Sequence, residues 1–221
     1  MNRHFQLELE SLKIILIKMG SVVEENVNNA LQALLEHESD LAHKVIENET
    51  RINSLEIEID NAIIDLLALQ QPVASDLRFI IAAQKINNDL ERIGDHAVNI
   101  AESDLNLLKI KPLDSLLEIP KMVVTIKLML HQALDSFILI DPKVAQTVLE
   151  TDDQIDDLNR SMTNEVIELL KSDKKTIECG LELIRISRNL ERIADIATNI
   201  AEEVIYYAQA RVVKHHAEER K

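Results

Sequence analysis

The sequence has 221 residues and a mass of 25.1 kDa, and it is 46% hydrophobic and 29% charged, which is typical of a folded globular protein. Three Gly and four Pro are too few for the turns of a β-sandwich or barrel, and an aromatic content of 2% with no Trp removes residues that strands favour. The composition therefore predicts an all-α protein, with either one large domain or two of about 100 residues.

The charge balance narrows the classes of partner. Acidic residues outnumber basic ones by 39 to 24, which gives a net charge of −15 at pH 7. Nucleic acid is not an expected partner, because binding its phosphates requires an excess of Lys and Arg. Metal cations and basic protein surfaces suit this charge better. The single Cys179 cannot form an internal disulfide, which is consistent with a reducing cytoplasm.

No targeting or membrane-spanning segment is expected. Glu8 and Glu10 interrupt the start of the chain, where a secretory signal would be continuously apolar. Uncharged stretches such as 128–134 end after about seven residues, far short of the roughly 20 that span a bilayer. We therefore expect a soluble protein without membrane insertion.

Apolar residues recur at steps of three and four through most of the chain, which predicts long amphipathic helices. Pro residues and short polar stretches divide the chain into six such helices. The expected helices run from Phe5 to about Leu35, from a cap at Ser39 or Asp40 to about Leu69, from a cap at Ser75 or Asp76 to about Leu108, from Asp114 or Ser115 to Ile140, from Pro142 to Ser172, and from there to about Ala210.

An internal repeat relates the two halves of the chain. Segment 90–102, LERIGDHAVNIAE, recurs at 190–202 as LERIADIATNIAE, with ten of 13 positions identical at an offset of 100 residues. An apolar pattern alone would not reproduce the Glu, Arg, Asp and Asn. The expected fold is therefore two tandem pseudo-symmetric three-helix bundles, residues 1–110 and 111–221, the second ending in a charged tail. An earlier echo at an offset of 103 pairs Glu49, Ile52, Asn53 and Leu55 with Asp152, Ile155, Asp156 and Leu158.

The repeated segment carries a row of oxygen-bearing side chains. Residues four apart share a helix face, and like charges at this spacing cost roughly 0.2–0.5 kcal/mol per pair unless a cation intervenes. These positions lie in mid-helix, beyond the reach of the helix dipole. Repetition of the row favours a cation site over a solvated face. The two rows are Glu91, Asp95 and Asn99, and Glu191, Asp195 and Asn199.

The preceding helix of each half offers a second acidic row. Two facing helices with carboxylates can form an all-oxygen site for Mg²⁺ or Mn²⁺, and carboxylate clusters also hold Fe or Zn. A structural zinc site would use Cys and His, and a ferritin-like di-iron site would use Glu-x-x-His, which does not occur in this chain. The opposing rows are Glu49, Asn53, Glu56 and Asp60, and then Glu150, Asp152, Asp153, Asp156 and Asp157.

Surface ion pairs are the alternative explanation for these charges. Arg92 and Arg192 come three residues before Asp95 and Asp195, a spacing that allows such pairs. Gly94 within a helix favours the close approach of a second helix. Neither a Gly-rich phosphate loop nor a nucleophile elbow occurs in the sequence, so an enzyme is not expected.

Several motifs of the chain resemble the PhoU family of phosphate-transport regulators, from about Phe5 to His215. The same motif appears in both halves in the order that this family has. The matching segments are QQPVASDLR at 70–78, LERIGD at 90–95, SRNLERI at 187–193, and the opening residues Phe5, 8–12 and Met19-Gly20.

The resemblance implies two pseudo-symmetric three-helix bundles, often in a homodimer, with a Glu-x-x-x-Asp motif in each half that binds multinuclear metal clusters in some members. The family's second motif commonly has Gly where this chain has Ala194. The metal ion, whether Fe, Zn, Mn or Mg, is not specified by the motif. Carried onto this chain, the motif residues are Glu91 and Asp95, and Glu191 and Asp195, and the acidic positions of the preceding helices are Glu49 with Asn53 and Asp152 with Asp156.

The resemblance also implies a function. Members of the family act when phosphate is plentiful: they link the ATP-binding subunit of the phosphate ABC transporter to the phosphate-sensing histidine kinase and hold the starvation response off. We therefore expect a metal-binding cytoplasmic adaptor, peripheral to the inner membrane through its protein partners. A carboxylate-bridged metal store or metal-dependent enzyme is the alternative, and a purely structural helical scaffold is a third possibility.

Overall fold

A computed structural model describes residues 3–72, 74–110 and 118–210 of the chain. Within these residues the secondary structure is helical and contains no strand, as the composition predicts. A short 3₁₀ turn, Lys174–Thr176, precedes the last helix. The helices are α1 Arg3–Glu36, α2 Ser39–Gln70, α3 Ala74–Leu107, α4 Ile119–Leu139, α5 Pro142–Ser172 and α6 Ile177–Gln209.

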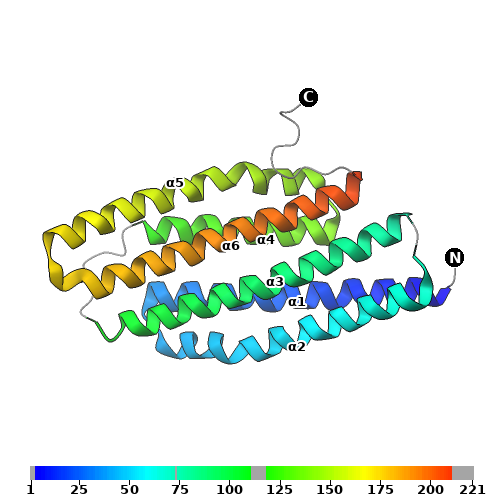
Figure 1. The fold of residues 1–221 in the computed structure, drawn as a ribbon, viewed down its shortest axis with the longest axis horizontal. Helices are drawn as coiled ribbons and strands as arrows, with labels where there is room; N and C mark the ends of the chain where they lie inside the picture. Colours follow the sequence, from blue (N-terminus) through cyan, green and yellow to red (C-terminus); the bar gives the residue numbers. More distant parts are fainter. Residues whose placement is uncertain (1–2, 73, 111–117, 211–221) are drawn as a thin grey trace.

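The helices form two sets of three that lie along a common long axis (Figure 1). α1, α2 and α3 pack on one another, and so do α4, α5 and α6. The two sets meet through α3 and α6, and through a smaller contact of α1 with α4. The predicted all-α fold of two three-helix bundles is confirmed. The predicted boundary near Lys111-Pro112 and the predicted start of the fourth helix lie outside the described residues.

The helix ends follow the local sequence, with two differences from expectation. Asp141 caps α5, accepting hydrogen bonds from the backbone N–H groups of Lys143 and Val144, with Pro142 in the first turn as predicted. The predicted caps of α2 and α3 are wrong. Glu38 is the N-cap of α2 and makes no side-chain cap bond, and α3 begins at Ala74, so Ser75 and Asp76 lie inside its first turn.

A single hydrophobic core runs through both halves, because α3 and α6 each bury side chains toward their own bundle and toward each other. Polar contacts cross the same junction. Lys85 Nζ lies 2.9 Å from Glu203 Oε1, and only 2% of the Glu203 side chain is exposed. His96 Nδ1 lies 2.9 Å from Asn189 Oδ1. The two bundles are therefore joined by specific pairs as well as by apolar packing.

α2 and α3 approach closely at Gly94, as the position of this residue in a helix predicts. A Cβ atom built on Gly94 would lie 2.9 Å from Ile52 Cδ1 on α2. In the second half the corresponding residues are Ile155 and Ala194, both buried. This approach fixes the register of the facing acidic rows, because Asn53 and Asp95 directly follow Ile52 and Gly94.

α4 is long and apolar enough, by length and composition, to cross a membrane, although the sequence predicts no such segment. Its most apolar 18-residue window has a mean hydropathy of 1.4, and half of that window is buried within the bundle. Packing against α5 and α6 is a sufficient reason for this composition, since a core helix of a helical bundle needs a broad apolar face.

The close approach predicts how position 94 tolerates side chains. Gly94→Leu should lower the free energy of unfolding by about 1–3 kcal/mol, because the added atoms overlap Ile52. Gly94→Ala should stay within about 1 kcal/mol of the original protein, because the gain in helix propensity offsets the shift of Ile52 that the added Cβ requires, as Ala194 does beside Ile155 in the second half. Urea unfolding of both variants measures this difference. Equal stability of the two variants would show that α2 and α3 are not in contact here.

Candidate metal centres

The first acidic cluster lies between α2 and α3. Burial raises the pKa of Glu91, and the nearby charges of Asp95, Glu56 and Glu49 raise it further. Burial likewise raises the pKa of Glu56, with further contributions from Asp60 and Asp95. Carboxylates on one helix thus affect those on the other, which means that α2 and α3 hold negative charges in proximity.

Asn53 adds a neutral oxygen to this cluster. Its Oδ1 atom is buried and has no hydrogen-bond partner among the described residues. Leaving a buried polar atom unpaired costs about 1–3 kcal/mol, so such atoms in folded proteins call for an explanation. An oxygen without a proton donor, beside several carboxylates, is suited to a cation.

The second cluster lies between α5 and α6 and repeats the first. Burial raises the pKa of Asp152 to about 6, with further increases from Asp156, Asp195, Asp153 and Glu191. The pKa of Glu191 is also raised, by burial first and then by Asp195 and Asp156. The four residues predicted for this half therefore belong to one electrostatically coupled group.

The motif arginines differ between the halves. Arg92 Nη1 lies 3.3 Å from Asp89 Oδ1, so its contact is away from the predicted site. Arg192 Nη1 lies 3.0 Å from Asp195 Oδ2, so a surface ion pair accounts for part of the second cluster. In the first cluster Arg92 makes no ion pair with the motif acids, although its charge still lowers the pKa of Glu91 against the larger effects of burial and of Asp95.

The structure separates the wider acidic rows into facing and peripheral residues. Asp60 accepts hydrogen bonds of 2.8 Å from the side chains of Gln84 and Asn87. Asp153 and Asp157 are exposed, and Asp157 pairs with Arg160 at 2.6 Å. Asp60 and Asp157 thus have other partners, and Asp60 and Asp153 act on the clusters only through their charges.

Two further positions differ from the simple rows of the sequence. Asn99 Oδ1 lies 3.5 Å from the Arg185 guanidinium of α6, so the end of that row faces the junction of the bundles. Glu56 belongs to the first cluster, although the residues carried over from the family motif leave it out. Its sequence signal is its spacing, three residues after Asn53 on the same face.

The donor set is made of oxygen atoms, which suits hard cations such as Mg²⁺ and Mn²⁺, and carboxylates also accept Fe and Zn. As the side chains stand, no group of three or more His, Cys, Asp or Glu within the described ranges converges closely enough to hold an ion. The eight predicted ligands therefore remain a prediction, and binding an ion would require their side chains to move closer together.

The chain matches a known family model in both halves. The PhoU domain model matches residues 16–103 and again residues 119–204. These ranges correspond to the two three-helix sets, so the internal repeat is a repeat of this domain.

Relatives that match nearly the whole chain belong to the same family. A phosphate-specific transport system accessory protein PhoU homolog of Clostridium acetobutylicum is 35% identical over 210 residues, which is 95% of this chain and 96% of that protein. The phosphate-specific transport system accessory protein PhoU of Escherichia coli K12 is 32% identical over 219 residues, 97% of this chain and 91% of that protein.

Solved structures agree in fold. The crystal structure of PhoU from Pseudomonas aeruginosa matches with a TM-score of 0.90 and 37% identity, covering 94% of this chain and all of that one. The phosphate transport system regulatory protein PhoU from Streptococcus pneumoniae matches with a TM-score of 0.87 and 32% identity, covering 95% of this chain and 99% of that one. The domain matches, the sequence relatives and the shared fold together mean that this chain belongs to the PhoU family.

Proposed function

We propose that this protein is a cytoplasmic adaptor that holds the phosphate-starvation response off when phosphate is plentiful. It would do so by contacting the ATP-binding subunit of the phosphate ABC transporter and the phosphate-sensing histidine kinase, working as a homodimer. The relatives named as accessory proteins of a phosphate-specific transport system support a role of this protein in phosphate transport. The net charge of −15 supports contact with basic protein surfaces, because opposite charges accelerate encounter.

The proposed adaptor binds metal ions at two sites, one between α2 and α3 and one between α5 and α6. The observation that carries this proposal is the set of facing acids whose pKa values are raised by burial and by one another, in both halves. A cation would replace the repulsion by attraction and give Asn53 Oδ1 a partner. The ligands would be Glu49, Asn53, Glu91 and Asp95 in the first half, with Glu56 beside them, and Asp152, Asp156, Glu191 and Asp195 in the second.

The two alternative functions predict different behaviour. A metal store or metal-dependent enzyme would bind many ions per chain or turn over a substrate, whereas an adaptor would bind a few ions and show no redox or hydrolytic activity. A purely structural scaffold would keep its thermal stability when chelators are added. Elemental analysis, activity assays and unfolding with and without chelator separate these cases.

Replacing the first motif should remove metal and regulation together. Glu91→Ala with Asp95→Ala deletes two carboxylates of the first cluster, so we expect the metal content of the purified protein to fall by about half, since one of two similar centres is lost. In cells grown with abundant phosphate, the same variant should raise expression of phosphate-uptake genes. Elemental analysis and a transcript assay measure the two effects.

A matched control for this experiment is Glu58→Ala with Asp65→Ala. It removes the same charge from exposed positions of α2 that do not contribute to the raised pKa values of either cluster, so metal content and gene expression should remain at the level of the original protein. Unchanged metal content in the Glu91 and Asp95 variant would overturn the proposal of a metal site between α2 and α3. A fall in metal with normal repression would retain the centre and overturn its role in regulation.

The raised pKa of Asp152 predicts a pH-dependent stability of the metal-free protein. Its pKa is about 6 in the folded chain against an ordinary value of 3.8, so the folded state binds the proton more tightly and stability falls as pH rises from about 4 to about 6. Asp152→Asn should therefore stabilise the metal-free protein at pH 7 by about 1 kcal/mol, a figure discounted for solvent screening of a partly exposed group. The gain should shrink toward pH 4.

Adding a divalent cation at pH 7 should make the unsubstituted protein more stable than Asp152→Asn, the reverse of the order without metal. The unsubstituted protein would then gain more, because ligand binding to the folded state stabilises it by mass action and Asn is a poorer ligand than Asp. Chemical unfolding with chelator and with Mn²⁺ tests this. If Asp152→Asn is destabilising in chelator at pH 7, the carboxylate is not under electrostatic strain and the facing arrangement is wrong.

A further inference from the structure

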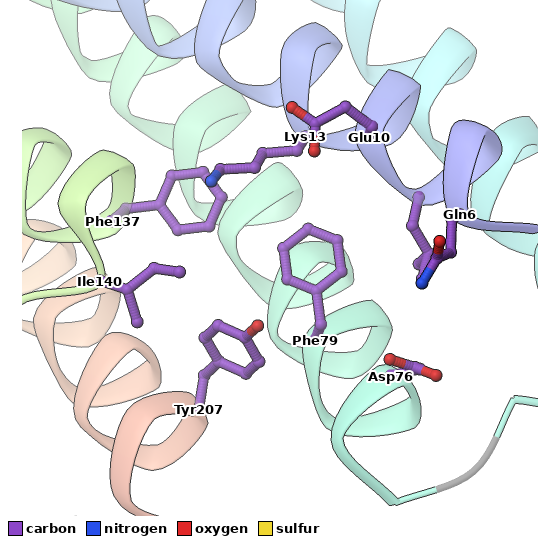
Figure 2. A pocket seen from close by; sticks show the side chains of 9 residues that line it. Gln6, Glu10, Lys13, Asp76, Phe79, Phe137, Ile140 and Tyr207 are labelled. Carbon is purple, nitrogen blue, oxygen red and sulfur yellow. The ribbon is translucent and has the colours of Figure 1, made fainter. Parts of the chain in front are cut away.

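A cavity of about 400 Å³ lies where the two bundles meet, at the end of the molecule where α1 and α3 begin and α4 and α6 end (Figure 2). Its lining comes from both halves: α1 and α3 of the first, and α4, the residue after it, and α6 of the second. Cavities of this size at the junction of two units are common sites for small ligands. This one is remote in sequence from the predicted metal ligands and shares no residue with them.

Aromatic rings are concentrated around this cavity. The whole chain has only three Phe and two Tyr, and Phe79, Phe137 and Tyr207 all line it. Figure 2 shows the three rings around one space, and the centroids of Phe79 and Tyr207 are 5.5 Å apart with a tilt of 59°. Three of the five aromatic residues of the protein thus surround a single hollow.

The rings depart from the internal repeat. At the offset of 100 residues that relates α3 to α6, Phe79 corresponds to Cys179, and Tyr207 corresponds to Leu107. Smaller or aliphatic residues therefore suffice for packing at the equivalent positions of the other bundle. Phe79 and Phe137 belong to the hydrophobic core, with 8% and 6% of their surfaces exposed, so these rings serve packing as well as lining the cavity. The shared three-helix fold does not by itself require aromatic rings at positions 79 and 207.

The polar lining is mainly acidic. Glu10 and Asp76 contribute two carboxylates, and Lys13 contributes one ammonium group, so the ionised lining carries a net charge of −1. Among the residues that the structure describes, no ion pair involves either carboxylate or Lys13. Figure 2 shows Glu10 and Lys13 together on α1, with the Lys13 chain extending toward Phe137, and Asp76 apart from them on α3, beside Phe79.

We propose that this cavity binds a small organic cation, a primary ammonium or guanidinium group on an aromatic or apolar stem. The faces of Phe and Tyr rings attract cations through their quadrupole, and the apolar stem would fill the space between the rings. Asp76 and Glu10, at separate points of the lining, would both attract the cationic group, and the nearer of them would accept its hydrogen bonds. Lys13 would oppose the ligand electrostatically, so its removal should improve binding.

Three small probes of similar shape and different charge test the proposal: 2-phenylethylammonium, 2-phenylethanol and 3-phenylpropionate. Each is titrated into the full-length protein in chelator at low salt and followed by NMR chemical shifts. We expect the cation to bind about threefold or more tightly than the neutral probe, the difference that one cation–ring contact supplies at a partly exposed site, and the anion to bind weakest. The shifts should centre on residues that line the cavity.

Substitutions then assign the effect to the named groups. Asp76→Asn with Glu10→Gln should raise the Kd for the cation about fivefold, and Lys13→Gln should lower it, since both change the local charge without removing the rings. Phe137→Leu should weaken all aromatic probes while keeping an apolar filler. Glu58→Gln with Asp65→Asn is the control, because it removes equal charge from exposed positions of α2, which contributes nothing to the cavity, and it should leave the Kd unchanged.

Thermal unfolding of each variant confirms that the fold is retained. Tighter binding of 3-phenylpropionate than of 2-phenylethylammonium, or weaker cation binding in Lys13→Gln, would overturn the proposal in favour of an anion site. Equal loss of binding in the Glu58 and Asp65 control would show general attraction to an acidic protein and would overturn it as well. If none of the three probes shifts the signals of residues that line the cavity, the proposal is also overturned.

Discussion

Repulsion between carboxylates held on facing helices is the constraint on which this structure depends. In each half, close helix packing brings acids of one helix near acids of the next, at Ile52 and Gly94 in the first half and at the equivalent pair in the second. Burial and mutual repulsion raise the pKa of Glu91, Glu191 and Asp152, which means that the ionised form is disfavoured there. The metal-free fold thus carries an electrostatic cost that a bound cation would relieve.

The two acidic clusters are connected through the junction of the bundles. α3 and α6 each present acids to their own bundle on one face and pack against each other on another. His96, directly after Asp95, is hydrogen-bonded to Asn189, which lies two residues before Glu191. A shift of either motif would therefore move residues at the α3–α6 contact. This contact gives a physical route by which metal binding in either half can change the surface formed by both bundles.

Much of the fold follows from sequence pattern, because six long amphipathic stripes with few Gly and Pro leave little choice of architecture, and the offset of 100 residues sets their pairing. Local caps were harder: Ser75 and Asp76 favour a cap by type, yet the helix begins at Ala74. Spacing also grouped Asp153 and Asp157 with Asp152 and Asp156, since only packing reveals which face of α5 meets α6. The aromatic cavity had no sequence signal, because its residues come from four helices far apart in the chain.

The most direct test of the account is a crystal structure of the protein soaked in Mn²⁺, with anomalous scattering used to locate the ions. We expect ions between α2 and α3 and between α5 and α6, with oxygen atoms of Glu91, Asp95, Glu191 and Asp195 among their ligands and the side chains of Asn53 and Asp152 turned toward them. Carboxylates that point into bulk water, with no anomalous signal between the helices, would contradict it.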